Sequence, residues 1–206
     1  MSMPEIIFAT GNPGKLREAS EILGEGFELS TPEDVGITED IPETGGTLDE
    51  NSLQKARYIY EKTFRDCFAD DTGLEVDALG GAPGVYTARY AGPSKDFGLN
   101  MDKVLSELAA LEDEAPSGVT VSRKARFRSV VTLILGGEVH QFEGVMEGSI
   151  ARRKSGAGGF GYDPIFIPDE YPSLTAADIT EEQKNEISHR GKALRAMAAF
   201  LDEIKV

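Results

Sequence analysis

A chain of 206 residues is long enough for one domain with a substantial core, or for a compact domain with two lobes. The net charge of −15, from 36 acidic and 21 basic residues, argues against nucleic acid and anionic membranes as partners. There is no apolar run of about eighteen residues that would predict a transmembrane helix. Met1 to Glu5 lack a signal-peptide pattern, and the single cysteine, Cys67, excludes an internal disulfide, so we expect a cytoplasmic protein.

Apolar periodicity and turn residues predict interspersed strands and helices, which is typical of a mixed α/β fold. The expected elements, in chain order, are a buried strand at 5–10, a helix at 15–23, a polar segment at 30–47, a helix at 48–64, a strand ending at 70–71, a Gly/Pro-rich loop to 92, a helix at 99–111, a connection at 113–124, a hairpin of 127–135 and 138–142, a third strand at 145–151, a glycine-rich loop at 155–164, a short helix after Thr180 and a last helix after Ser188.

Two adjacent carboxylates, Asp70 and Asp71, follow a short apolar run at the point where the strand is expected to give way to a turn. Because side chains alternate across a strand, only one of the two is expected to face a cleft there. A carboxylate in that place can hold a divalent cation and accept a proton from water, as metal-assisted hydrolysis requires. An acidic turn on a solvated surface would show the same pair, so the neighbouring motifs decide between the two interpretations.

The junction between the first strand and the first helix has the composition of an anion site. Free amides at a helix N-terminus attract anions, and glycine lets the backbone approach closely. It is not a Walker A loop, because the spacing of glycines before the lysine differs. A capped turn without a ligand would use similar residues. Those expected to contact an anion are Thr10, Gly11, Asn12, Pro13, Gly14 and Lys15.

A second acidic segment precedes the helix at 48–64. Glu43 lies just before that helix and is a candidate metal ligand, because hard cations prefer oxygen donors. Lys55, about two turns into the helix, is a candidate phosphate contact. A solvated acidic loop with a surface lysine is the alternative.

Two later segments add aromatic and cationic groups. In the glycine-rich loop, Phe160, Gly161, Tyr162 and Asp163 offer a stacking face and an acceptor for a base, unless the rings fill a core. Further on, the segment from 184 to 192 places Lys184, His189 and Arg190 around a helix start, where they can donate to a keto oxygen or a phosphate. The alternative for that segment is a set of ordinary surface residues.

Taken in order, these segments resemble the inosine triphosphate pyrophosphatase family, the non-canonical purine nucleoside triphosphate pyrophosphatases. Four ordered motifs spread over nearly the whole chain make the resemblance specific. The matching strings are Ala9 to Lys15, Asp70 to Gly84 with Tyr86 and Arg89, Gly158 to Pro164, and Ser188-His189-Arg190.

The resemblance implies hydrolysis of ITP, dITP and XTP to the monophosphate and pyrophosphate, with Mg²⁺ as cofactor. It also implies a homodimer and a single two-lobed domain over 1–206, with a long central mixed sheet and the active site in a cleft between the lobes. Asp71 matches the proton acceptor and, with Glu43, the metal ligands. The positions that match substrate contacts are Thr10, Gly11, Asn12, Pro13, Gly14, Lys15, Lys55, Thr72, Phe160, Gly161, Tyr162, Asp163, Lys184, His189 and Arg190.

On this interpretation Asp71 positions or deprotonates a water that attacks the α-phosphorus, while Asp70 plays a supporting part. Donors such as His189 and Arg190 would favour a 6-keto purine over adenine. Two alternatives remain: a general nucleotide phosphatase that releases orthophosphate, and a purine nucleotide sensor without catalysis. The carboxylates argue against the sensor, and the product released separates the two enzymes.

Overall fold

The computed structural model describes residues 4–204, so Met1 to Met3, considered above for a signal peptide, lie outside it. The chain divides into two compact units. Unit 1 contains the residues up to Asp71, residues 129–144, and the residues from His189 onward. Unit 2 contains residues 72–128 and 145–188. Within residues 4–204, none of the helices is long and apolar enough to span a membrane.

Six strands hydrogen-bond in the order β2-β1-β3-β4-β5-β6. β1 runs parallel to β2 and β3, whereas β5 and β6 are antiparallel, so the predicted mixed α/β fold is confirmed. The strands span β1 Glu5–Phe8, β2 Glu28–Ser30, β3 Cys67–Val76, β4 Lys124–Leu135, β5 Glu138–Ile150 and β6 Phe166–Pro168.

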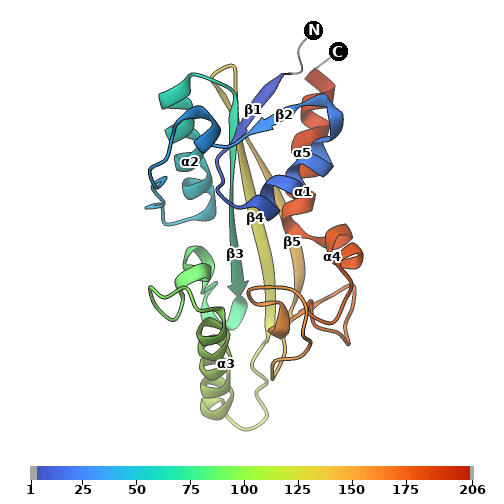
Figure 1. The fold of residues 1–206 in the computed structure, drawn as a ribbon. Coiled ribbons are helices and arrows are strands. Elements are labelled where there is room, and N and C mark those ends of the chain that lie inside the picture. The colour runs from blue at the N-terminus through green and yellow to red at the C-terminus, as the bar shows by residue number, and fades with distance from the viewer. Residues whose placement is uncertain (1–3, 205–206) are drawn as a thin grey trace. The chain divides into compact units, whose positions relative to one another are not determined.

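Unit 1 is a sheet with helices on both faces. Its helices are α1 Pro13–Leu23, α2 Leu48–Thr63 and α5 His189–Ile204. Figure 1 shows α2 on one side of the strands and α1 with α5 on the other. The strand side chains divide accordingly: Phe8 and Phe68 pack with α1 and α5, whereas Ile7 and Cys67 pack with α2. This division follows from the period of two along a strand.

The helix boundaries follow the capping residues. Thr47 accepts from the amide of Glu50, and Glu50 reaches back in a capping box that starts α2. α1 ends at Gly24, whose φ of 65° suits glycine. In unit 2, the predicted capping box at Thr180 is present and starts α4, Glu181–Ile187.

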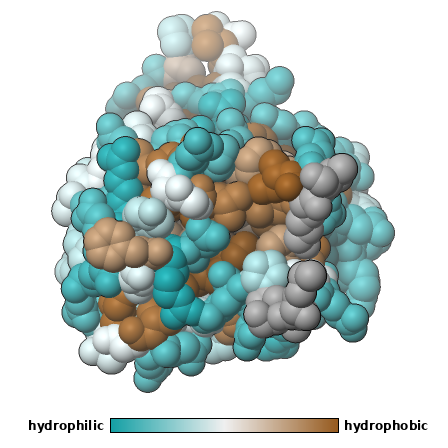
Figure 2. All heavy atoms as spheres, turned by 90° about the horizontal axis from the view of Figure 1, so that it is seen from above, coloured by the Kyte–Doolittle hydropathy of each residue, from teal (hydrophilic) through white to brown (hydrophobic). Residues whose placement is uncertain are grey.

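Unit 2 packs around α3, Phe97–Glu114, which is longer than the predicted helix. Leu74, Val76, Val104 and Leu108 are buried in its core. The short 3₁₀ helices of the two units are Gly24–Gly26, Glu33–Val35, Asp77–Leu79, Gly84–Arg89 and Asp163–Ile165. Seen from above the view of Figure 1, the surface shows apolar side chains gathered toward the middle among hydrophilic ones (Figure 2).

Two predicted strand boundaries are wrong. β3 does not end at Asp71 but continues to Val76, because Leu74 and Val76 are buried in the core of unit 2. β5 likewise continues through Gly144, where two strands were predicted. A Cβ on Gly144 would lie 1.9 Å from the His189 carbonyl oxygen, so this glycine permits close approach of α5 rather than a turn. The turn at Gly136-Gly137 is confirmed; both glycines have positive φ, as tight hairpins require.

Candidate active site

Asp70 and Asp71 lie on opposite faces of β3. Asp70 shares the face of Phe68 and meets α1 and α5, whereas Asp71 shares the face of Ala69 and meets α2. The two carboxylates therefore face different surroundings, as the alternation of side chains along a strand predicts. Each carboxylate has a lysine partner of its own.

The Asp70 side is a buried ion cluster. Asp70 is 2% exposed, and both of its carboxylate oxygens lie 2.8 Å from Lys15 Nζ. Arg190 Nε lies 3.5 Å from Asp70 Oδ2, and the same guanidinium meets Glu18 at 3.1 Å. Burial alone would raise the pKa of Asp70, but Lys15, Arg190 and Lys55 outweigh it and lower the pKa to about 2. Asp70 is thus a permanent anion that holds two cations in place.

The Asp71 side joins two carboxylates through one ammonium group. Lys55 Nζ lies 2.7 Å from Glu43 Oε1 and 3.0 Å from Asp71 Oδ1. Burial raises the pKa of Asp71 and outweighs the opposing effect of Lys55. Burial lowers the pKa of Lys55, but the carboxylates around it outweigh burial and raise it. Lys55 is therefore a buried cation between Glu43 and Asp71, not a surface lysine.

The loop before α1 is shaped by Asn12. The side-chain oxygen of Asn12 accepts from the backbone amides of Gly14 at 2.8 Å and Lys15 at 3.3 Å. The backbone amide of Asn12 donates to Thr10 Oγ1. Two amides that were expected to face an anion are thus used by the N-cap in this structure. The Lys15 side chain, 25% exposed, extends to Asp70.

The glycine-rich loop of unit 2 separates its two aromatic rings. Phe160 is 64% exposed, whereas Tyr162 is buried and its hydroxyl donates to the Thr87 carbonyl oxygen at 2.8 Å. The interpretation of Tyr162 as a stacking face is therefore wrong, because its ring fills the core of unit 2. Phe160 alone presents a ring, and Lys184 Nζ lies 5.5 Å from its centre.

Asp163 shapes the same loop. Its Oδ2 accepts from the Phe160 amide at 2.7 Å and pairs with Lys184. A Cβ on Gly159 would lie 2.3 Å from that oxygen, so glycine is needed there. The carboxylate predicted to meet a base is thus already engaged within the loop and orients Lys184.

The sequence model of the Ham1 family matches residues 6–200, which is nearly the whole chain. The chain belongs to the Ham1 family. This membership confirms the resemblance drawn from the four motifs.

Relatives of this Ham1 chain carry a common name. A Porphyromonas gingivalis protein named dITP/XTP pyrophosphatase is 47% identical over 199 residues, covering 97% of this chain and 98% of the relative. A Bacillus subtilis protein of the same name is 45% identical over 202 residues, covering 97% and 98%. The solved structure of a HAM1 protein from Coxiella burnetii has a TM-score of 0.88 at 38% identity, covering 98% of this chain and 100% of that one. The solved structure of the Staphylococcus aureus Ham1 protein has a TM-score of 0.86 at 36% identity, covering 97% of this chain and 98% of that one.

The donor set of this Ham1 chain on the Asp71 side suits a divalent cation. Glu43 and Asp71 come from a loop and a strand, yet both carboxylates reach the same ammonium group. Carboxylate oxygens are the ligands that a hard cation such as Mg²⁺ prefers, although one oxygen of each carboxylate is bound to Lys55 in this structure. Glu43 is 42% exposed at its side chain, so the pair is accessible from one side.

The remaining predicted residues have clear positions. His189 is buried at the first position of α5, next to Arg190, as the motif predicts. Thr72 follows Asp71 in β3 and is the first residue of unit 2. The sequence interpretation missed Glu18, which meets Arg190; its place three residues after Lys15 on α1 was the available signal.

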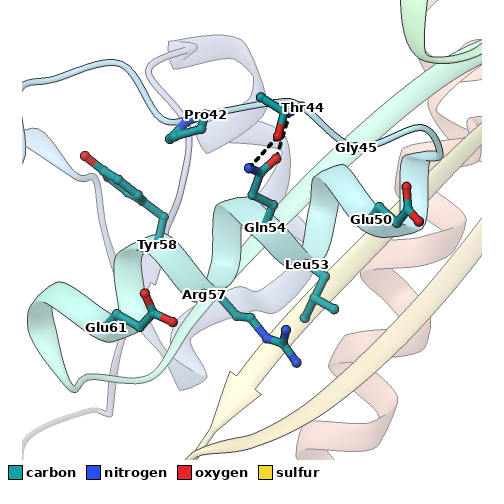
Figure 3. A pocket seen from close by; sticks show the side chains of 9 residues that line it. All are labelled: Pro42, Thr44, Gly45, Glu50, Leu53, Gln54, Arg57, Tyr58 and Glu61. Atoms are coloured by element: carbon teal, nitrogen blue, oxygen red, sulfur yellow. Dashed lines mark hydrogen bonds between the residues drawn. The ribbon is translucent and has the colours of Figure 1, made fainter.

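A surface hollow of about 500 Å³ lies beside α2 of unit 1 (Figure 3). Side chains of the outward-facing α2 residues line it together with the loop that precedes the helix. Glu43 and Lys55 are not among the residues that line this hollow, so it is distinct from the group formed by Glu43, Lys55 and Asp71. The lining residues are Pro42, Thr44, Gly45, Glu50, Leu53, Gln54, Arg57, Tyr58 and Glu61.

Proposed function

We propose that this chain hydrolyses non-canonical purine nucleoside triphosphates, namely ITP, dITP and XTP, to the monophosphate and pyrophosphate. The observation that carries the proposal is the division of Asp70 and Asp71 to the two faces of β3, each with its own cations. The names of the Porphyromonas and Bacillus relatives support the same substrate class.

The charges of unit 1 suit a polyphosphate. A nucleoside triphosphate carries about four negative charges, which local cations must offset during phosphoryl transfer. Although the net charge of the chain is −15, three cationic side chains lie around β3: Lys15, Lys55 and Arg190. Asp70 pairs with Lys15 and Arg190 and orients both side chains for the phosphates.

The reaction chemistry falls to Asp71. In the proposed step, a water oxygen attacks the α-phosphorus, the bond to the α–β bridging oxygen breaks, and the water proton passes to an Asp71 carboxylate oxygen. Burial raises the pKa of Asp71, which favours its acceptance of a proton. Lys55 orients this carboxylate together with Glu43.

We propose Mg²⁺ as the cofactor, held by Glu43 and Asp71. When bound, the cation offsets phosphate charge and lowers the pKa of a coordinated water. The carboxylate donor set supports a hard cation over zinc, which favours nitrogen and sulfur ligands.

For the base, the proposed contacts in unit 2 are the exposed ring of Phe160 and the Lys184 ammonium beside it. A purine can stack on the ring, and an ammonium can donate to a 6-keto oxygen but not to the amino group of adenine. We also propose that the protein is a homodimer and that it acts in the cytoplasm, where a nucleotide-pool enzyme meets its substrate. Light scattering of the purified protein measures the oligomeric state.

The test is a product assay. The protein is incubated with ITP and Mg²⁺, and pyrophosphate and orthophosphate are measured separately, with ATP as the competing substrate. We expect one pyrophosphate for each ITP consumed and little turnover of ATP. Orthophosphate as the first product would indicate a general phosphatase, and binding of ITP without any product would indicate a sensor.

A further inference from the structure

The loop that carries Glu43 lies outside regular secondary structure, yet α2 holds it at several points. Residues 40–45 belong to no helix or strand. The position of the Glu43 carboxylate therefore depends on side-chain bonds from the helix. This inference rests on the proposed function, because it concerns how the metal-binding carboxylates are placed.

Gln54 makes the first attachment. Its Oε1 accepts from the Thr44 amide at 2.8 Å, and its Nε2 donates to Thr44 Oγ1 at 2.9 Å (Figure 3). Both ends of one amide thus bind the residue next to Glu43. Gln54 precedes Lys55, which binds the Glu43 carboxylate itself. Two neighbouring α2 residues therefore fix the backbone and the side chain of the same loop.

Asn51 makes the second attachment, one helical turn earlier. It is 2% exposed, and its Oδ1 accepts from the Gly45 amide at 2.7 Å. The Asn51 side chain also acts to lower the pKa of Asp71, against the larger effect of burial. A buried side-chain amide of α2 therefore holds the backbone of the loop two residues after Glu43.

The backbone at Gly45 permits this close contact. A Cβ there would lie 2.7 Å from Glu50 Cβ and 2.9 Å from Asn51 Oδ1. Any larger residue would push the loop away from α2. Glycine is required here by proximity, not by its backbone angles.

We propose that Gln54 and Asn51 are positioning residues that hold the loop of Glu43 against α2, so that the Glu43 and Asp71 carboxylates meet at one cation. In this proposal neither residue binds substrate or metal itself. Their action resembles that of the partners that orient metal ligands in other sites, where removal of one partner weakens metal binding by about 10–100-fold.

The experiment measures Mn²⁺ binding by electron paramagnetic resonance in the absence of nucleotide, alongside the Mg²⁺ dependence of ITP hydrolysis. Gln54→Met keeps the size of the side chain and removes both hydrogen bonds. We expect it to raise the Mn²⁺ dissociation constant about tenfold and the half-saturating Mg²⁺ concentration similarly, with kcat at saturating Mg²⁺ nearly unchanged. Gln54→Glu can accept both bonds from Thr44 and should recover most of the affinity.

Two further variants complete the design. Tyr58→Phe is the matched control, because it removes a hydrogen bond from α2 to Glu39, four residues before Glu43, and leaves the bonds to Thr44 and Gly45 intact. Gly45→Ala displaces the loop without removing any bonding side chain and should weaken Mn²⁺ binding more than Gln54→Met does. Circular dichroism melting of each variant shows that the fold is retained.

The outcomes separate this inference from the proposed function. Mn²⁺ affinity in Gln54→Met equal to that in Tyr58→Phe overturns the positioning role, as does the absence of saturable Mn²⁺ binding in the wild type. A wild-type protein that binds Mn²⁺ through this loop but does not hydrolyse ITP overturns the proposed function and leaves the positioning role supported.

Discussion

Replacing Asp70 or Asp71 by asparagine should give opposite results, although the two residues are adjacent and the substitutions are the same. Asp70→Asn removes the anion that two cations share on the α1 and α5 face of β3. Asp71→Asn removes one of two carboxylates around Lys55 on the α2 face. We expect the first to reduce stability and the second to reduce activity with little effect on stability.

The cost of Asp70→Asn can be estimated in two ways. Folding lowers the pKa of Asp70 from 3.8 to about 2, which corresponds to roughly 2 kcal/mol of stability at pH 7. This contribution is present above the unfolded-state pKa and is lost as the pH falls through about 2. Removing one partner of a buried ion pair costs about 3–5 kcal/mol. Because asparagine keeps one acceptor for Lys15, we expect a loss of about 3 kcal/mol.

The pKa shift of Asp71 has the opposite sign to that of Asp70, and so does its effect on stability. Folding raises its pKa, so the ionised carboxylate opposes folding at pH 7. In Asp71→Asn the Lys55 ammonium keeps Glu43 as its partner. The free energy of unfolding should therefore stay within about 1 kcal/mol of the wild type or rise slightly. Loss of the proton acceptor should lower kcat by about a thousandfold or more.

Urea unfolding at pH 7 without divalent cations, followed by circular dichroism, measures both stabilities. The turnover of ITP is measured on the same preparations. Equal stability losses in the two variants would refute the separation of Asp70 and Asp71 to two faces. Near-normal turnover by a well-folded Asp71→Asn protein would refute its catalytic role.

Three further predictions follow from single positions. Gly144→Ala should reduce the free energy of unfolding by at least about 3 kcal/mol, because its Cβ would meet the His189 carbonyl oxygen; urea unfolding measures this, and a loss under 1 kcal/mol would contradict it. Phe160→Ala should raise KM for ITP at least about threefold with the melting temperature nearly unchanged, because the ring is exposed and lies edge-on to Phe97 and beside Lys184; an unchanged KM in steady-state kinetics would remove Phe160 from the site. Burial raises the pKa of the Cys67 thiol to about 12, so stability from this group is lost only as the pH rises from 9 through 12; at pH 8 a thiol reagent should react only on unfolding, and fast reaction of the native protein would contradict its burial.

Local signals in the sequence were sufficient for much of the fold. The apolar spacing of α2, the capping box at Thr180 and the glycine pair at Gly136-Gly137 depend on neighbours within a few residues. These elements lie where the sequence predicts them. The four motifs likewise placed the charged residues of unit 1 in one family pattern.

Contacts between distant residues explain what the sequence analysis missed. Thr72-Gly73 read as a turn, because only the core of unit 2 explains why Leu74 and Val76 continue the strand. Two separate strands were predicted on either side of Gly144, because only the position of α5 explains why a glycine is needed within one continuous strand. For Tyr162 the sequence left both a stacking role and a core position open, because its partner, the Thr87 carbonyl, is far away in the sequence.

The proposed reaction depends on attack of water at the α-phosphorus, with Asp71 as the proton acceptor. Hydrolysis of ITP in ¹⁸O-labelled water, followed by mass spectrometry of both products, tests it most directly. We expect one ¹⁸O in inosine monophosphate and none in pyrophosphate. Label in pyrophosphate, or in orthophosphate released first, would contradict it.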